Sequence, residues 1–525
     1  MTHRLRPFFT IFILAAASAA LCAGPGQSRP AAGAEKRESI FDRNVVLVKP
    51  LMTEIPVVPR LCDSLALEKK RVSVGDCELY VEEEGRGTPL VLVNGGPGGT
   101  HHYFHPWFGR TADFARVIYY DQRGCGLSDY NPGPDGYTVE QAVADLDAVR
   151  NALGIEKWAV LGYSYGGFLA QYYATKYPER LAGLVLLGAV PGMWVEMKPT
   201  RQYDFLSPEE QARIRDIGQE ITEGAAERQW PPEKTMALRV YNNHLNGDWK
   251  RQHVFKPSPE KLARKALYEW IFDLKNNFRS GISKSQDLVD LTGAFDRFPV
   301  PTLICEGKWD LTWNTDKPEI LAGNHPGAKL VVFEKAGHAV YDEEPEAFFA
   351  ALQDFVVRLP AVSPAALASY KSTATEWDRL RRSSPLYYIR AAGFGRAGLT
   401  ELAKAYKREW CDTLKDWPDF GKLGFAQYET ANYAEGLQIF ELMERAAENK
   451  QNASTKALAL IWQGHMLDLL GRRAEAVARY KTVVDMNIKD TWKHSTYGLQ
   501  YEVSAYSRER MEKPFVRVEN KEKAP

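Results

Sequence analysis

Residues 162–167, GYSYGG, place a serine between glycines in a setting that suits chemistry. An apolar run, residues 158–161, precedes them, and residues 168–177 follow with the spacing of an amphipathic helix. Strand, sharp turn and helix in that order form the nucleophile elbow, which exposes a serine hydroxyl where a helix begins and developing negative charge is stabilised. By itself the segment also fits an ordinary glycine-rich turn, and its neighbours decide for Ser164 as a nucleophile.

A serine hydroxyl is a weak nucleophile at neutral pH, so it needs a base, usually a histidine whose tautomer a carboxylate fixes. In hydrolases with a nucleophile elbow, the serine is followed along the chain by an acid and then by the histidine, each after a strand. Downstream of Ser164, Asp310 and His338 each follow a short apolar run typical of a buried strand. Glu306 lies closer to its strand and is the competing candidate for the acid. We predict a triad of Ser164, Asp310 and His338.

A glycine-rich loop, residues 94–99 (NGGPGG), follows another apolar run and has almost no side chains to keep a ligand from its amides. In this type of hydrolase, the loop supplies one N–H of the oxyanion hole, and the residue after the nucleophile supplies the other. We assign these donors to Gly96 and Tyr165. Three histidines that follow the loop are candidates to line the pocket: His101, His102 and His105.

The elements that must position these residues alternate between apolar runs of strand length and amphipathic helices, which predicts a doubly wound, mostly parallel sheet of the α/β-hydrolase type. A polar and aromatic stretch interrupts this alternation and is expected to be an inserted helical cap. The predicted division is a signal peptide over 1–23, an N-terminal arm over 24–66, the sheet domain over 67–190 and 292–360, the cap over 191–291, and a helical domain over 361–525.

The helical domain contains two similar segments, residues 433–440 and 473–480. Their offset of 40 residues is somewhat longer than the tetratricopeptide period of about 34 residues. Two copies are also fewer than the three or so that stacked repeats usually need. A tetratricopeptide-like array and a plain all-α bundle therefore both remain open.

Several motifs together resemble the prolyl iminopeptidase family of α/β-hydrolase serine peptidases: NGGPGG, DQRGCGLSD, GYSYGG, GKWD and GHAVYDEEPEAF. The resemblance covers residues 67–359. It implies an aminopeptidase that releases N-terminal residues from short peptides, with Ser164 as nucleophile, Asp310 as orienting acid and His338 as base. The family usually has histidine where Asn94 stands and often tryptophan where Tyr165 stands. The tyrosine is similar to the tricorn-interacting aminopeptidase branch, which is less restricted to proline.

The resemblance also implies that carboxylates, partly from the cap, recognise the free amino group of the substrate. A buried cationic amine needs paired negative charge. We take Glu269, beside Trp270 on an expected helix, as the substrate-binding candidate, although a solvated helix face would also account for it. The other candidates in the cap are Glu196, Glu220 and Glu223.

The first residues indicate export. A basic start, a short apolar core and a run of small residues ending at Ala23 are typical of a cleaved signal peptide, so we expect a secreted or periplasmic protein with no membrane span after cleavage. An uncleaved N-terminal anchor is the alternative. An exported protein can form a disulfide between Cys62 and Cys77 but need not do so.

Composition limits the function further. The 525 residues carry no net charge, and no basic run is interleaved with aromatic residues, which argues against nucleic acid as a partner. No cysteine or histidine cluster with metal-ligand spacing was recognised, so we expect neither a metal nor a cofactor. The main alternative function is an esterase or lactonase that acts on small acyl esters with the same triad. A non-catalytic protein that binds a protein partner through its C-terminal helices is a third possibility.

Overall fold

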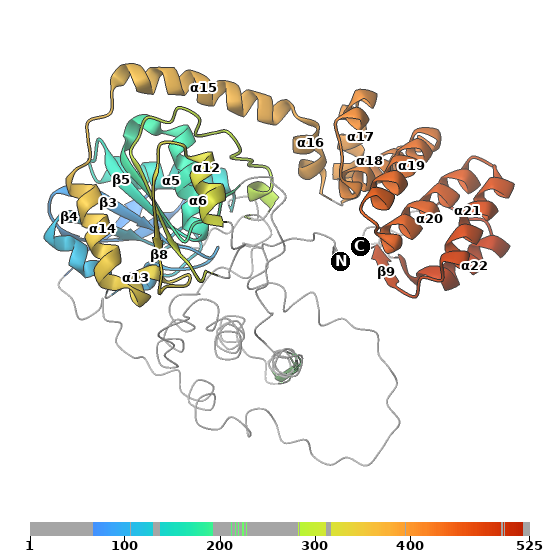
Figure 1. Cartoon of the computed structure of the whole chain (residues 1–525), viewed down its shortest axis with the longest axis horizontal. Coiled ribbons are helices and arrows are strands. Elements are labelled where there is room, and N and C mark those ends of the chain that lie inside the picture. Colours follow the sequence, from blue (N-terminus) through green and yellow to red (C-terminus); the bar gives the residue numbers. More distant parts are fainter. Residues whose placement is uncertain are drawn as a thin grey trace, which may run out of the picture. The chain divides into compact units, whose positions relative to one another are not determined.

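The computed structural model describes residues 67–105, 107–129, 137–192, 284–310, 317–393, 395–494 and 499–517, together with residue 497 and isolated positions between 212 and 282 (Figure 1). The chain divides into two compact units after Trp377. The signal peptide, the N-terminal arm and most of the cap that the sequence predicts lie outside the described residues.

The first unit is built on an eight-stranded sheet in the order β1-β2-β4-β3-β5-β6-β7-β8. From β4 onward along this order the neighbouring strands are parallel, while β2 is antiparallel to both β1 and β4. The predicted mostly parallel sheet is therefore confirmed. The strands are β1 (Glu68–Ser73), β2 (Glu78–Gly85), β3 (Thr88–Val93), β4 (Ala115–Tyr120), β5 (Trp158–Tyr163), β6 (Leu181–Leu187), β7 (Thr302–Gly307) and β8 (Lys329–Phe333).

Helices cover both faces of this sheet. Successive side chains of a strand point to opposite faces, so each strand contributes to two buried clusters. In β3, Val91 and Val93 join one buried cluster, while Leu90 and Leu92 join another. The first cluster includes side chains of α5 (Val139–Ala152), α6 (Tyr165–Lys176) and α12 (Lys317–Asn324). The second includes side chains of η2 (Trp107–Asp113), α13 (Val340–Glu343) and α14 (Pro345–Val357). Two further 3-10 turns are η1 (His101–Tyr103) and η3 (Pro178–Arg180). Cys77 is a buried free thiol in the first cluster.

Helix α15 (Pro364–Ser383) changes the predicted domain boundary. Leu367 belongs to the buried core of the first unit, and the hydroxyl of Tyr370 donates a hydrogen bond of 2.8 Å to the carbonyl of Ala294. The composition change at residues 360–364 marks only the loop before this helix. The two units consequently divide after Trp377 and not at residue 360.

The second unit is mainly helical, with one small β-hairpin that the all-α expectation did not include. Its helices are α16 (Pro385–Ala392), α17 (Arg396–Ala405), η5 (Arg408–Asp412), α18 (Trp417–Glu429), α19 (Tyr433–Asn449), α20 (Ala453–Leu469), α21 (Arg473–Met486) and α22 (Val503–Glu512). The hairpin joins β9 (Thr491–His494) to β10 (Leu499–Glu502) and pairs Trp492 with Tyr501. Within the described part of the chain, no helix has both the length and the apolar character needed to cross a bilayer.

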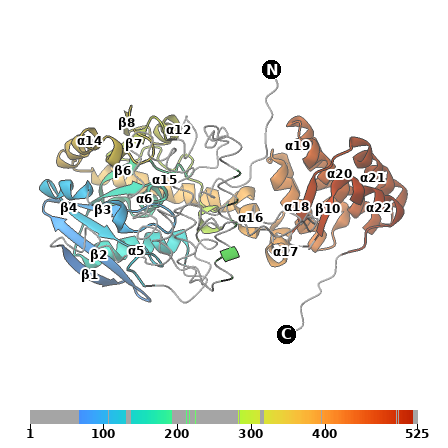
Figure 2. The same ribbon diagram turned by 90° about the horizontal axis from the view of Figure 1, so that it is seen from below.

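Helices α18 to α21 pack against one another in chain order (Figure 2). Helix α21 begins at Arg473, 40 residues after α19 begins at Tyr433. The turns after α18, α19 and α20 each contain one left-handed residue, at Ala431, Gln451 and Gly471. The amide after each of these residues donates to the carbonyl five positions earlier, which is the Schellman helix end.

The same period appears in the packing of these helices. A Cβ on Gly424 would lie 2.6 Å from Phe440, and a Cβ on Gly464 would lie 2.4 Å from Tyr480. In both helix pairs the absence of a side chain at the glycine lets an aromatic ring of the next helix approach closely. The sequence similarity of residues 433–440 and 473–480 therefore corresponds to two equivalent helix pairs.

Candidate active site

Ser164 lies in the turn between β5 and α6. Its φ of 56° and ψ of −121° are rare for a residue with a side chain, and such strain is typical of functional turns. The neighbouring glycines leave the necessary space. A Cβ on Gly162 would lie 2.3 Å from the carbonyl oxygen of Gly166, and a Cβ on Gly166 would lie 2.1 Å from that of Val93. The predicted elbow is therefore present, with Ser164 only partly buried.

The glycine-rich loop passes directly against Ser164. A Cβ on Gly95 would lie 2.9 Å from the Cβ and 3.5 Å from the Oγ of Ser164, so only glycine permits this approach. The loop is closed by the amide of Gly99, which donates to the carbonyl of Gly95 at 3.1 Å, and by the side-chain amide of Asn94, which donates to the carbonyl of Gly99. Gly96 lies between these contacts with a φ of 128°. The loop and the elbow are thus brought together as the sequence predicted.

Tyr165 is the first residue of α6, and its side chain belongs to the core. The phenol is buried, stacks on Phe168 and has no hydrogen-bond partner among the described residues. Burial raises the pKa of Tyr165 well above its usual value. The contribution of Tyr165 to the site is consequently restricted to its backbone amide at the start of the helix.

His338 and Asp310, the residues predicted as base and acid, contact each other. Nδ1 of His338 lies 2.8 Å from Oδ2 of Asp310, and both side chains are buried. The imidazole lies 5.0 Å from the ring of Tyr163, which precedes the serine, and a Cβ on Gly188 would lie 3.1 Å from Nδ1. His338 therefore lies at the ends of β5 and β6, beside the elbow. With Nδ1 held by the carboxylate, Nε2 is the nitrogen suited to exchanging a proton.

Lys317 is a member of this site that the sequence analysis missed. Its ammonium lies 2.7 Å from Oδ2 of Asp310 and 2.5 Å from Oε2 of Glu306, and all three side chains are buried. Glu306 also accepts a hydrogen bond of 3.0 Å from the amide of Ala189. The competing acid candidate is thus bound to Lys317 and a backbone amide, while Asp310 is the carboxylate bound to His338. No sequence motif marked Lys317, because a lysine at the start of a helix is usually solvated.

The two buried carboxylates share the ammonium of Lys317, and their pKa values shift in opposite directions. Burial by itself would raise the pKa of Asp310, but His338 and Lys317 outweigh it and hold this pKa well below the usual range. Burial raises the pKa of Glu306 to about 7, although Lys317 opposes the shift. For Lys317, burial lowers the pKa but the two carboxylates outweigh it and raise it. One ammonium therefore stabilises the charge of Asp310 and leaves Glu306 partly neutral.

The DQRG segment, residues 121–124, is hydrogen-bonded to the glycine-rich loop. The side-chain amide of Gln122 donates to the carbonyl of Asn94 at 2.8 Å. The next residue, Arg123, forms a buried two-point ion pair with Asp145 of α5, at 2.8 and 2.9 Å. The motif therefore has a structural role, because it connects the glycine-rich loop beside Ser164 to α5.

The three histidines after the loop differ in their burial and in the residues that they contact. His101 is fully buried, and its Nδ1 contacts Asp121 at 2.8 Å. The ring of His105 stacks on Tyr119, and its Nε2 contacts Glu82 at 3.1 Å. By contrast, His102 is partly buried, and its Nδ1 lies 2.9 Å from the hydroxyl of Thr100. His101 and His105 thus face a buried glutamate.

Of the four glutamates named as candidates in the cap, only Glu223 lies within the described residues. It is exposed and accepts a hydrogen bond of 2.7 Å from Gln219. The substrate-binding candidate Glu269 and the alternatives Glu196 and Glu220 lie outside the described residues.

Comparison with known proteins identifies similar chains. The alpha/beta hydrolase fold family model matches residues 88–345. A proline iminopeptidase of Saccharolobus solfataricus is 30% identical over 276 residues, which cover 52% of this chain and 86% of that protein. One from Neisseria gonorrhoeae is 30% identical over 305 residues, covering 54% of this chain and 94% of that protein. The solved proline iminopeptidase of Mycobacterium smegmatis aligns at 21% identity with a TM-score of 0.37, covering 58% of this chain and all of that one.

Proposed function

Because this chain belongs to the prolyl iminopeptidase family of α/β-hydrolases, and is therefore a serine hydrolase, we propose that it is an aminopeptidase that uses Ser164, His338 and Asp310 as its triad. The observation that carries the proposal is the hydrogen bond of 2.8 Å between His338 and Asp310 beside the strained turn at Ser164. Nucleophile, orienting acid and base then follow the chain order of this fold.

The proposed reaction is acyl transfer in two steps. Oγ of Ser164 attacks the scissile carbonyl, and Nε2 of His338 takes the hydroxyl proton and gives it to the departing amine. The C–N bond breaks and an acyl-enzyme remains. Water then attacks this ester, His338 takes the proton of the water and returns it to Ser164, and the freed N-terminal residue leaves with a carboxylate. Asp310 keeps the imidazole in the required tautomer and stabilises its positive charge.

The oxyanion of each tetrahedral intermediate is assigned to the amides of Gly96 and Tyr165. Support comes from the close approach of the glycine-rich loop to Ser164 and from the position of Tyr165 at the first turn of α6. Amides fixed in this way stabilise the charge that develops in the transition state without reorganising.

Recognition of the substrate amine is assigned to Glu269. A free amino terminus is cationic at neutral pH, and a carboxylate that pairs with it would restrict cleavage to the first residue of a peptide. The proposal therefore distinguishes an aminopeptidase from an esterase, whose acyl substrates carry no such charge.

We also propose that the protein is exported and that residues 378–525 form a module for binding a protein partner. The support for export is the pattern of residues 1–23, which is typical of a signal peptide. The 40-residue helical repeat supports the second proposal, since stacked helix pairs often build binding surfaces. Cell fractionation tests the first, and affinity capture with residues 378–525 removed or retained tests the second.

The catalytic proposal is tested with proline and alanine arylamides, the same arylamides with an acetylated amino group, and short-chain nitrophenyl esters. We expect turnover of the free arylamides, loss of turnover when the amine is acetylated, and slower turnover of the esters at equal concentration. Ser164→Ala is the control for activity from contaminants. Efficient ester hydrolysis together with no cleavage of any arylamide would replace the aminopeptidase with the esterase.

A further inference from the structure

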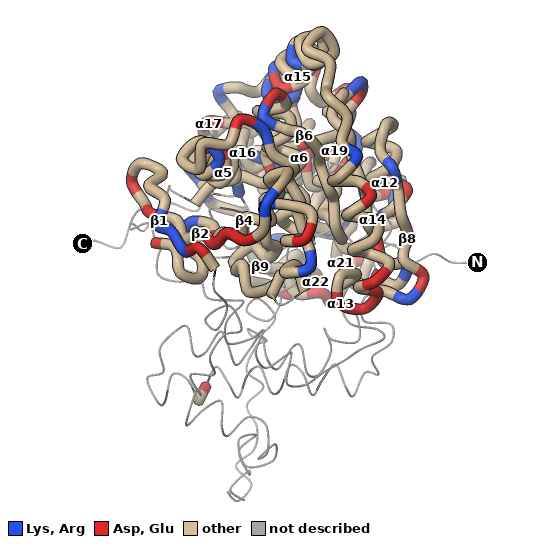
Figure 3. The backbone as a smooth tube through the Cα atoms, turned by 90° about the vertical axis from the view of Figure 1, so that its left-hand side faces the viewer, with Lys and Arg blue, Asp and Glu red and all other residues tan. Residues whose placement is uncertain are grey.

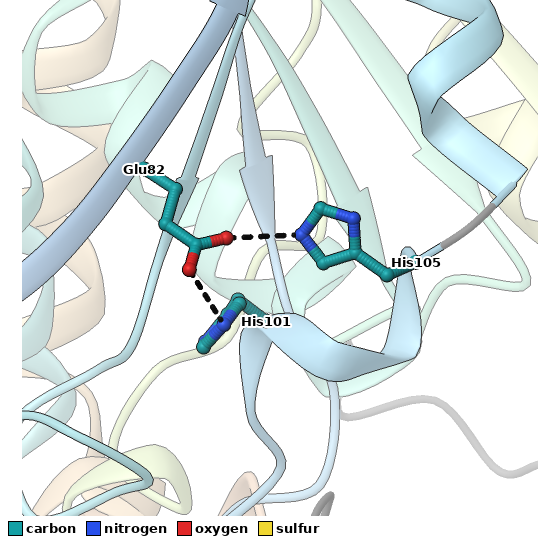
Figure 4. A group of neighbouring side chains, drawn as sticks. All are labelled: Glu82, His101 and His105. Carbon is teal, nitrogen blue, oxygen red and sulfur yellow. Dashed lines mark hydrogen bonds and ion pairs between the residues drawn. The ribbon is translucent and has the colours of Figure 1, made fainter. Parts of the chain in front are cut away.

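Three possible metal ligands lie close together at a site that contains no member of the triad. Glu82 lies on β2, while His101 opens the turn η1 and His105 follows it. Figure 4 shows the carboxylate of Glu82 between the two imidazoles, with one oxygen directed at each. All three contributing atoms lie within 4.8 Å of one another. Two histidines four residues apart and one carboxylate form a ligand set that divalent transition metals favour.

The distances between the imidazole nitrogens and the carboxylate oxygens are compatible with a metal ion bound by all three side chains. Nε2 of His101 lies 3.5 Å from Oε1 of Glu82, and Nε2 of His105 lies 3.1 Å from Oε2. Zinc-bound nitrogen and oxygen atoms at about 2.0–2.1 Å in a tetrahedron are about 3.3 Å apart. A hydrogen bond between nitrogen and oxygen is usually about 2.9–3.0 Å long. The two measured separations therefore bracket the spacing of two ligands on one metal ion, with each imidazole facing a different oxygen of Glu82.

The charge of the group also calls for a cation. Glu82 and Asp121 are both fully buried, and no lysine or arginine among the described residues pairs with either. The neighbouring Glu83 differs, because Arg116 and Lys70 both contact it. Figure 3 shows the acidic residues of β2 in red. A buried carboxylate is costly without compensation, and a divalent cation would balance both Glu82 and Asp121.

The surrounding residues orient the group as they do in known metal sites. Asp121 contacts Nδ1 of His101 at 2.8 Å, which leaves Nε2 as the ligand nitrogen. This arrangement of carboxylate, histidine and metal recurs in zinc proteins, where it fixes the tautomer. The hydroxyl of Tyr80 donates to Glu82 at 2.6 Å, and Tyr119 stacks on His105 with 4.3 Å between the ring centroids. These contacts restrict the side-chain orientations of Glu82 and His105.

We propose that Glu82, His101 and His105 bind one zinc-class divalent metal ion that fastens η1, and with it the glycine-rich loop, to β2. Water or another ligand would complete the coordination. The ion would stabilise the fold beside the active site and would take no part in acyl transfer. This inference revises the expectation from sequence of no metal, and it does not depend on the identity of the substrate.

The test uses the full chain without a histidine tag, dialysed against chelator and then against Zn²⁺ or Co²⁺. We expect about one equivalent of either metal per chain. The Co²⁺ protein should show the visible d–d absorption of a low-symmetry site, and Zn²⁺ should raise the midpoint of thermal unfolding.

Two variants and one control identify the ligands. His105→Gln and Glu82→Gln should each lower the affinity for Zn²⁺ by at least about tenfold. His102→Gln, on the same turn but outside the group, should keep the wild-type affinity. If one ligand variant does not fold, two measurements still test the proposal. They are the rise in the unfolding midpoint of the wild type with Zn²⁺ and the Zn²⁺ affinity of the other variant.

Two results would overturn the proposal. Retention of no metal, with no stabilisation by Zn²⁺, would show that these three side chains bind no metal ion. Equal loss of affinity in His102→Gln and the ligand variants would place the metal elsewhere.

Discussion

The ammonium of Lys317 lies 2.7 Å from Oδ2 of Asp310, the same oxygen that contacts Nδ1 of His338 at 2.8 Å. The proposed orienting acid is therefore held by a buried cation as well as by the histidine. The same ammonium also contacts Glu306, so Lys317 is shared by two buried carboxylates.

Removing this cation should destabilise the protein. Lys317→Met would leave Asp310 and Glu306 buried without their ammonium, and breaking a buried pair costs about 3–5 kcal/mol of unfolding free energy. Urea unfolding measures the change. Lys329→Met is the control, because Lys329 is exposed and 3.4 Å from Asp354, so its loss should cost about 1 kcal/mol or less. Equal stability of the two variants would show that Lys317 does not balance the buried acids.

The two acid candidates should differ in activity. Asp310→Asn would allow the wrong tautomer of His338, for which the serine-protease precedent is a loss of about 10⁴ in kcat. Glu306→Gln keeps the shape of a side chain that contacts Lys317 and the amide of Ala189, so kcat should stay within about tenfold of wild type. Steady-state kinetics on an arylamide compares them. A severe loss in Glu306→Gln with a mild one in Asp310→Asn would exchange their roles.

The pKa of Glu306 predicts how stability depends on pH. This pKa is about 7 in the folded chain against 4.5 for an ordinary glutamate, mainly because of burial. The folded state thus holds the proton more tightly, so this stabilisation is complete below pH 4.5 and is lost as pH rises through 7. Between about pH 5 and about pH 8, wild type should lose unfolding free energy relative to Glu306→Gln, which stays neutral. Parallel pH dependence of the two proteins in urea would contradict the shift.

Ser164→Ala tests the nucleophile without disturbing the fold, since the side chain is partly exposed at the turn. We expect activity to fall by several orders of magnitude, by about 10⁶ in the precedent of serine-protease nucleophiles. Labelling by a fluorophosphonate probe should disappear as well, while the unfolding midpoint in urea stays close to that of wild type. Substantial remaining turnover or labelling would place the nucleophile elsewhere.

The first unit should function without the second, provided that α15 is kept. A chain that ends after Ser383 retains the contacts of Leu367 and Tyr370 with the core and should be soluble and cleave a small arylamide. A chain that ends at Pro360 loses both side chains, and burial of just one large apolar residue stabilises by about 2–5 kcal/mol. Activity and urea unfolding compare the two chains. Equal stability would restore the boundary at residue 360, and an inactive chain ending at Ser383 would make the second unit part of the catalytic domain.

Local pattern was sufficient to predict the sheet, the elbow at Ser164, and the pairing of Asp310 with His338. Apolar runs, glycines and the order of residues along the chain carry this information, because each is read within a few neighbouring positions. The 40-residue similarity in the helical domain likewise appeared in the sequence, although the small hairpin of β9 and β10 did not.

Tertiary structure alone decided which distant charges share a buried site. Lys317 and Glu82 belong to no motif. Each acquires its proposed role from the partners that folding places around it, Asp310 and Glu306 for Lys317, and His101 and His105 for Glu82. The same holds for α15, whose Leu367 and Tyr370 pack back onto the first unit after a loop that resembles a boundary. Burial and charge balance depend on how elements pack in space, so a pattern of neighbouring residues does not contain them.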